Sequence, residues 1–173
     1  RFTRASQGGV GFAKAAGNYA ATFYPTKLAN SKGFQQIIWT DANEHQYIEE
    51  CGTMNIFFRI GAKIVTPKIS ETILDGVTRK SVITIARDLG IEVEERKVSV
   101  SDLLDAHSSG VLKEVFGTGT AVSISPVSSF TFRENKVILP DVEDSYALKL
   151  KKELIGIQKG RVQDTYNWTS KLI

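Results

Sequence analysis

Apolar residues recur at helical spacing in two stretches of this chain. The first stretch predicts a helix over residues 77–89 that ends at Gly90, a residue suited to the left-handed turn that closes many helices. The second predicts a helix that opens at Asp144 or Ser145 and closes at Gly160. The apolar positions are Val82, Ile85, Ala86 and Leu89 in the first stretch, and Ala147, Leu150, Leu154 and Ile157 in the second.

Two further helices are predicted from the residues at their ends. Asn18 is a suitable cap for a helix over residues 18–32. Pro25 falls inside that helix and should kink or restart it, because proline lacks an amide hydrogen and crowds the preceding turn. Ser101 is a candidate cap for a short helix over residues 102–109.

β-branched and aromatic residues predict short strands between these helices. The predicted strands cover residues 36–40, 47–50, 54–60, 63–66 and 91–94, and a hairpin is expected over 128–139 around Glu134 and Asn135. The segment 1–13 is expected to be a loop, and the Gly-Thr-Gly-Thr sequence at 117–120 has the composition of a turn. This mixture of strands, hairpins and helices favours an α+β fold over a doubly wound parallel sheet.

Composition and charge limit the classes of function. The 173 residues suit a single domain over 1–173, and the net charge of +3 comes from basic residues scattered among acidic ones, so no nucleic-acid partner is expected. No apolar run reaches 18 residues, which predicts no membrane span. Cys51 is the single cysteine and has no disulfide partner within the chain. His45 and His107 lack the paired spacing of a metal site, so no metal is expected.

Three segments carry candidate chemistry. Lys14 lies in the glycine-rich segment 8–19, Glu50 lies in the segment 47–57, and the Gly-Thr-Gly-Thr sequence lies in the segment 116–121. Taken singly, each has an ordinary explanation: a solvated loop lysine, an edge-strand glutamate that faces water, and a glycine turn. Glu50 stands among apolar strand residues, however, where an ionised carboxylate needs a partner.

The order and wording of these segments together resemble the C-terminal half of the branched-chain aminotransferases, which are fold-type IV enzymes that use pyridoxal phosphate. The most specific stretch is 50–57, Glu-Cys-Gly-Thr-Met-Asn-Ile-Phe, which looks like the Glu-x-Gly-Thr-Met-Asn-Ile-Phe signature of the larger, eukaryotic-type members. The resemblance extends roughly from Gly8 to Trp168. It implies the C-terminal large domain of that fold type, a mixed sheet or pseudo-barrel flanked by helices.

The resemblance also implies a role for each candidate residue. Lys14 falls on the catalytic Schiff-base lysine, Tyr19 on the partner of the cofactor's phenolic oxygen, and Glu50 on the partner of its pyridine nitrogen. The remaining cofactor-binding positions, which would hold the phosphate, are Val77, Thr78, Gly119 and Thr120. The substrate-binding positions are Thr53, Thr120 and Ala121.

A few positions depart from the family pattern. Ala16 replaces the first glycine of the usual Gly-Gly-Asn-Tyr, and Asp75 stands where proline is common. Val122 and Ser125 occupy the positions of a Cys-x-x-Cys redox pair that some mammalian members carry, so no such redox switch is expected. Cys51 is expected to be a small buried hydrophobe.

The implied reaction is the transamination of leucine, isoleucine and valine with 2-oxoglutarate, so the small-molecule partners would be amino acids and 2-keto acids. The family's N-terminal domain, which supplies a phosphate-binding arginine and much of the substrate pocket, has no room in 173 residues. This chain alone is therefore expected to be a poor catalyst. A homodimer is expected, in the cytoplasm or, in a eukaryote, in mitochondria.

Two alternatives stay open from the sequence. One is a cofactor-binding fragment or non-catalytic remnant that cannot turn over without its other half. The other is an activity of the D-amino acid aminotransferase or aminodeoxychorismate lyase kind, because those enzymes share the lysine and glutamate chemistry.

Overall fold

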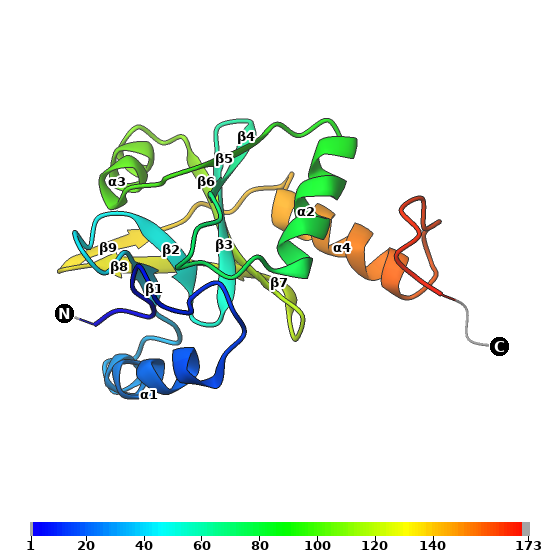
Figure 1. Cartoon of the computed structure of the whole chain (residues 1–173). Coiled ribbons are helices and arrows are strands. Elements are labelled where there is room, and N and C mark those ends of the chain that lie inside the picture. Colours follow the sequence, from blue (N-terminus) through cyan, green and yellow to red (C-terminus); the bar gives the residue numbers. More distant parts are fainter. Residues whose placement is uncertain (1, 171–173) are drawn as a thin grey trace.

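The computed structural model describes residues 2–170, so Arg1, part of the loop predicted for 1–13, and residues 171–173 lie outside the description (Figure 1). The helices of the described part are α1 (Ala16–Asn30), α2 (Val77–Asp88), α3 (Val100–Ser108) and α4 (Tyr146–Gln158). The strands are β1 (Ile38–Thr40), β2 (Ile48–Cys51), β3 (Met54–Ile60), β4 (Lys63–Pro67), β5 (Val93–Arg96), β6 (Leu112–Gly119), β7 (Ser123–Val127), β8 (Ser129–Phe132) and β9 (Asn135–Ile138).

Strand β3 is the centre of the main sheet. One of its edges pairs with β6, while β2 and β4 share the other edge, β2 at the start of β3 and β4 at its end. The strands β1, β5 and β7 extend the sheet beyond β2, β4 and β6. Only the β4–β5 pair is parallel among the pairings of the described residues. The predicted α+β class is therefore confirmed, and a doubly wound parallel sheet is excluded.

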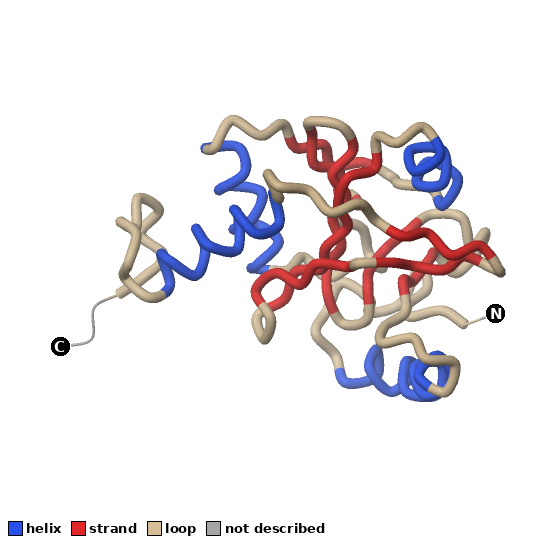
Figure 2. The backbone as a smooth tube through the Cα atoms, turned by 180° about the vertical axis from the view of Figure 1, so that it is seen from behind, coloured by secondary structure: helices blue, strands red, loops and turns tan. Residues whose placement is uncertain are grey.

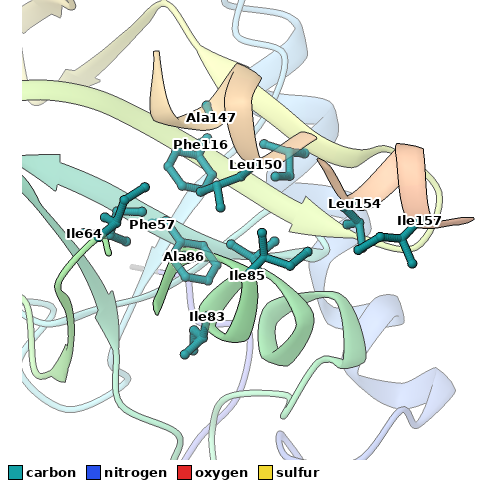
Figure 3. Close-up of a cluster of buried hydrophobic side chains, with 13 residues drawn as sticks. Phe57, Ile64, Ile83, Ile85, Ala86, Phe116, Ala147, Leu150, Leu154 and Ile157 are labelled. Carbon is teal, nitrogen blue, oxygen red and sulfur yellow. The ribbon is translucent and has the colours of Figure 1, made fainter. Parts of the chain in front are cut away.

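The two faces of this sheet bury separate hydrophobic clusters. On one face, Phe57 and Phe116 stack with their ring centroids 5.2 Å apart and pack against apolar residues of α2 and α4 (Figure 3). The opposite face buries Ile56, Phe58 and Val115 against residues that include Leu103 of α3. Figures 1 and 2 show α2 and α4 side by side, with α1 and α3 well apart from them.

Helix α1 packs differently from the other helices. Only Thr22 and Pro25 are buried along its length, while Phe23 and Tyr24 are 71% and 66% exposed. Helix α1 therefore contributes no residue to either of the two hydrophobic clusters.

The segments with clear periodic patterns fold as predicted. Helix α2 follows the expected 77–89 range and is closed by Gly90, whose φ is +74°. Helix α4 opens at the predicted Ser145, whose side chain accepts a hydrogen bond from the Leu148 N–H. The hairpin predicted over 128–139 is confirmed as β8–β9. The strands predicted at 36–40, 47–50, 54–60 and 63–66 are confirmed within a few residues.

The predicted details of α1 are partly wrong. The helix spans residues 16–30 rather than 18–32, and its N-cap is Ala15, which offers no side-chain cap. Asn18 instead donates from its side chain to the carbonyl groups of Val10 and Ala13. The helix also runs unbroken through Pro25. The ring of Pro25 is buried against the rest of the protein, and that contact helps to offset the lost backbone hydrogen bond.

Three other predictions need correction. The cap of α3 is Ser99, which forms a capping box with Asp102, and Ser101 is not the cap. Strand β5 occupies 93–96 rather than 91–94. The Gly-Thr-Gly-Thr sequence at 117–120 is not a turn for most of its length. Residues 117–119 complete strand β6 and pair with β7, a strand that the sequence pattern did not predict.

Candidate active-site cleft

A two-residue hairpin loop sets the position of Glu50. Gly52 and Thr53 connect β2 to β3, and the φ of +59° at Gly52 matches the turn type that places glycine first. A side chain at Gly52 would be strained by this left-handed φ and would displace the exposed end of Gln36, whose Oε1 lies 2.1 Å from the position of a Cβ. The hairpin places Glu50 directly opposite Asn55.

Three polar side chains form a row across this part of the sheet. Glu50 of β2 pairs with Asn55 of β3, which in turn pairs with Thr118 of β6. Directly paired residues of antiparallel strands project to the same face. All three side chains therefore lie on the face that further along carries Phe57 and Phe116, although each is buried. Buried polar groups in a row at the edge of a hydrophobic core point to a binding site rather than to packing.

A small cleft brings several predicted site residues together. Tyr19, Glu50 and Thr53 all line it. Its remaining lining residues are Arg4, Ala13, Asn18, Thr22, Gly52 and Leu74. The space open to water is only about 20 Å³, which is the size of one water molecule rather than of a larger ligand.

Glu50 is buried with two contacts to its carboxylate. Its side chain accepts a hydrogen bond from the Leu74 N–H at 2.8 Å on Oε1, and Arg4 Nε lies 3.1 Å from Oε2. Arg4 Nε makes no hydrogen bond among the described residues, so this contact is an ion pair without hydrogen-bond alignment. Burial raises the pKa of Glu50 to about 7, against the opposing effects of the Arg4 charge and the Leu74 N–H. An ordinary edge-strand glutamate faces water, whereas the side chain of Glu50 is buried.

Lys14 lies at the edge of this cleft. It is exposed, in the loop just before α1, and it does not line the cleft, although Ala13 beside it does. The loop is held from both sides: Asn18 Nδ2 donates to the Val10 and Ala13 carbonyls at 2.9 Å, and Arg4 Nη2 donates to the Gly11 carbonyl at 3.2 Å. Because Arg4 contacts both this loop and Glu50, it connects the predicted lysine and the predicted acid.

The predicted phosphate-binding residues lie at the start of α2 and after β6. Gly76 is the N-cap of α2, no side chain caps it, and the first turn holds no acidic residue. The N–H groups of Val77 and Thr78 therefore have no partner within the helix and suit an anion. Thr78 is buried and Val77 is exposed. Gly119 ends β6 and is half-buried, while Thr120 and Ala121 are exposed in the turn that follows.

Asn55 lies between these two groups. A Cβ on Gly76 would lie 2.2 Å from Asn55 Oδ1, and Asn55 is the cross-strand partner of Thr118. The start of α2 and the end of β6 therefore approach the same strand residue, which brings the predicted phosphate positions to the side of the sheet that carries Glu50.

Sequence reasoning missed three residues that organise this region: Arg4, Asn18 and Asn55. A signal existed for Arg4, because a carboxylate in an apolar strand needs a cation and this arginine precedes the lysine segment. Asn18 looked like a helix cap. Asn55 gave no signal of its own, because its partners come from a loop some 20 residues away in sequence, and Asn55 Nδ2 donates to the Leu74 carbonyl at 2.7 Å.

The comparisons with known proteins identify the family. The family model described as "Amino-transferase class IV" matches residues 12–130. The chain therefore belongs to the class IV aminotransferase family.

Curated relatives name a narrower group. The chain is 47% identical over 168 residues to a "Probable branched-chain-amino-acid aminotransferase" of Staphylococcus epidermidis, covering 96% of this chain and 47% of that protein. It is 45% identical over 172 residues to "Branched-chain-amino-acid aminotransferase 2" of Bacillus subtilis, covering 99% and 47%. The chain thus spans about half the length of the curated relatives that it matches.

Solved structures share the fold. The branched-chain amino acid aminotransferase from Escherichia coli superposes with a TM-score of 0.78 at 29% identity, over 96% of this chain and 53% of that one. The branched-chain amino acid aminotransferase from Thermobaculum terrenum, solved in its PLP-form, superposes with a TM-score of 0.79 at 26% identity, over 93% and 50%. Residues 2–170 contain no helix that is both long and apolar enough to cross a bilayer.

Proposed function

We propose that this chain is the lysine-bearing half of a pyridoxal-phosphate-dependent aminotransferase that acts on leucine, isoleucine and valine with 2-oxoglutarate. The observation that carries the proposal is the buried Glu50 carboxylate in a cleft shared with Tyr19 and Thr53. The names of the relatives, at up to 47% identity, support the substrate class. The products are branched 2-keto acids and glutamate.

The residues present fit pyridoxal phosphate. Glu50 offers a buried carboxylate for a protonated ring nitrogen, and Tyr19 lines the same cleft with a phenol for the ring oxygen. The uncapped start of α2 offers the N–H groups of Val77 and Thr78 to a phosphate. Thr118 adds a buried hydroxyl, 1% exposed, that has no partner among the described residues.

The chain's own residues then divide the work. When bound, the cofactor supplies a ring that draws electrons from the α-carbon of an attached amino acid. Lys14 would supply the amine that holds the cofactor aldehyde, and once the amino group of the substrate has displaced it, the free Nζ would take the proton from the substrate α-carbon. Glu50 holds the ring-nitrogen proton in place. Thr53 and the turn at Thr120 and Ala121 orient the substrate.

The other half of the site comes from outside this chain in our proposal. The cleft is too small for the cofactor, Lys14 is exposed, and α1 presents the exposed rings of Phe23 and Tyr24. We propose that an N-terminal domain, in the same or a separate polypeptide, covers this side and that the complete enzyme is a homodimer. The buried thiol of Cys51 has no need of an oxidising compartment, which suits a cytoplasmic location.

The same observations favour a second candidate for the isolated chain, a cofactor-binding fragment without turnover. Supplying the N-terminal half separates the two. A fragment that gains activity on reconstitution supports the complete-enzyme proposal. A chain that binds the cofactor and stays inactive in the full-length protein supports the remnant.

The test is covalent trapping in the full-length protein. Borohydride reduction with pyridoxal phosphate, followed by peptide mapping, is expected to label Lys14. Lys14→Ala is expected to remove the label and to lower transamination of leucine by at least about 10²-fold. Lys32→Ala changes an exposed lysine in the turn after α1 and should leave both unchanged. A label on another lysine would contradict the proposal, and a preference for D-alanine over leucine would contradict its substrate class.

A further inference from the structure

One backbone segment joins the predicted ring-nitrogen partner to the predicted phosphate site. The Leu74 N–H donates to Glu50 Oε1 at 2.8 Å, and the Leu74 carbonyl accepts from Asn55 Nδ2 at 2.7 Å. The same carbonyl accepts from the Gly76 N–H at 2.9 Å. Gly76 is the N-cap of α2. Leu74 is therefore bonded to the acid through its amide and to the start of the helix through its carbonyl.

Asn55 holds this segment from the sheet. It is 6% exposed in β3, between its cross-strand partners Glu50 and Thr118. Its amide contacts the segment at two points, the Leu74 carbonyl and the α-carbon region of Gly76, where a Cβ would lie 2.2 Å from Oδ1. A strand residue paired on both sides moves little, so it fixes the loop that it contacts.

We propose that Asn55 is a positioning residue that sets the spacing between the Glu50 carboxylate and the start of α2. Through that spacing it selects a ligand with a cationic ring nitrogen at one end and a phosphate at the other. Asn55 is not among the residues that line the cleft, and it acts through Leu74 and Gly76. The inference rests on the proposed function for the identity of the ligand, but the spacing is a property of the protein without cofactor.

The first measurement needs no cofactor. Hydrogen–deuterium exchange of the peptide that contains Leu74, followed by mass spectrometry, reports how firmly the Leu74 N–H is held by Glu50. In Asn55→Ala and in the isosteric Asn55→Asp, which cannot donate to the carbonyl, this amide should exchange up to about tenfold faster, the value of one buried hydrogen bond. Asn135→Ala, an exposed strand asparagine in β9, should leave its exchange unchanged.

The second measurement compares two ligands of different length. The ratio of the dissociation constants of pyridoxal and pyridoxal phosphate measures how well both ends are engaged together. Asn55→Ala should lower this ratio by about tenfold relative to the full-length wild type, and Asn55→Asp is left out of this comparison because its carboxylate would itself repel a phosphate. A role confined to stability would weaken both ligands alike and leave the ratio unchanged.

The third measurement tests the contact with Gly76 directly. Gly76→Ala should lower the affinity for pyridoxal phosphate, because its Cβ would collide with Asn55 Oδ1. Adding Asn55→Ala removes that oxygen, so the double variant should lose less than the sum of the two single losses.

Each outcome bears on a different claim. If the wild type binds no pyridoxal phosphate, the proposed function fails, while the exchange of the Leu74 amide still tests the spacing. If the wild type binds it, and the folded Asn55→Ala variant keeps both the ligand ratio and the Leu74 exchange rate, the inference about Asn55 is overturned and the proposed function stands.

Discussion

Two buried arginine–glutamate pairs of this protein are built from the same residue types and are completed very differently. Glu114 of β6 accepts from Arg59 Nη1 at 3.2 Å, Ser145 Oγ at 2.5 Å, and the Tyr146 and Ala147 N–H groups at 2.8 and 3.1 Å. Glu50 of β2 accepts one hydrogen bond, from the Leu74 N–H, and faces an Arg4 Nε that donates none.

The arginines differ in the same way. Arg59 also donates to the backbone and side chain of Asp144, and its guanidinium lies 3.7 Å from the ring centroid of Tyr146. These contacts fasten the start of α4 to the sheet. A pair in which nearly every lone pair has a donor has no capacity left for a ligand, whereas the incomplete pair at Glu50 does. Burial is alike in the two pairs, and the difference between them lies in the number of hydrogen bonds that each carboxylate accepts.

The largest effect that would test this comparison is on stability, at Arg59. Arg59→Leu leaves Glu114 buried without its cation, which should lower the free energy of unfolding by about 3–5 kcal/mol. Urea unfolding of the purified protein measures this loss. Arg87→Leu removes an exposed ion pair with Glu95 and should cost less than about 1 kcal/mol. If both variants lose equally little, the Arg59 pair is not the structural anchor that its contacts indicate.

The next effect concerns Glu50 and pH. Burial disfavours the charged form of this carboxyl group and raises its pKa from the ordinary value of 4.5 to about 7 in the folded protein. The folded state therefore holds a proton that the unfolded state releases between these pH values. The contribution of Glu50 to the free energy of unfolding is fully present below about pH 4.5 and is lost as the pH rises through about 7. In the cofactor-free protein this loss amounts to up to about 3 kcal/mol.

Glu50→Gln tests this directly, because glutamine does not titrate. The variant should show a flatter dependence of unfolding free energy on pH between about 4.5 and 7. Some slope should remain, since burial also raises the pKa of Glu49. The exposed Glu134→Gln should keep the wild-type slope. A slope unchanged by Glu50→Gln would show that this carboxylate is already charged in the folded protein and is paired as completely as Glu114.

The sequence predicted the strands around Glu50 better than the contacts that its side chain makes. The residue types of 47–50 and 54–60 predicted the two strands on either side of the Gly52–Thr53 loop, because strand propensity is a local property. The role of Arg4 depends on a loop folding back against β2, which no local pattern encodes. Asn18 illustrates the same limit: its capping propensity was recognised, but its side chain bonds to the preceding loop instead.

The prediction of a turn at the Gly-Thr-Gly-Thr sequence 117–120 was wrong for a related reason. Glycines at 117 and 119 suggested a turn, yet the segment is the end of a strand. A Cβ at Gly117 would lie 2.8 Å from Met54 Cε, so this glycine leaves room for a side chain of the neighbouring strand. Close approach between strands and a flexible turn select the same residue, and only the tertiary contact distinguishes them.

The smallest expected effect distinguishes a buried hydroxyl group that has a hydrogen-bond partner from one that has none. Thr66 of β4 donates from Oγ1 to the Ile56 carbonyl at 2.8 Å, while Thr118 Oγ1 has no partner among the described residues. Both side chains are at least 99% buried. Thr66→Val should therefore cost about 1 kcal/mol, because it leaves a buried carbonyl without its donor.

Thr118→Val should be neutral or stabilising by up to about 1 kcal/mol in the cofactor-free protein, because it removes a hydroxyl that was desolvated without a hydrogen bond. The same variant should bind pyridoxal phosphate more weakly if that hydroxyl serves the ligand. Thermal unfolding with and without cofactor measures both effects on one sample. Should Thr118→Val destabilise the cofactor-free protein as much as Thr66→Val does, the hydroxyl is already satisfied by the protein, and incompleteness no longer marks this side of the sheet as the binding site.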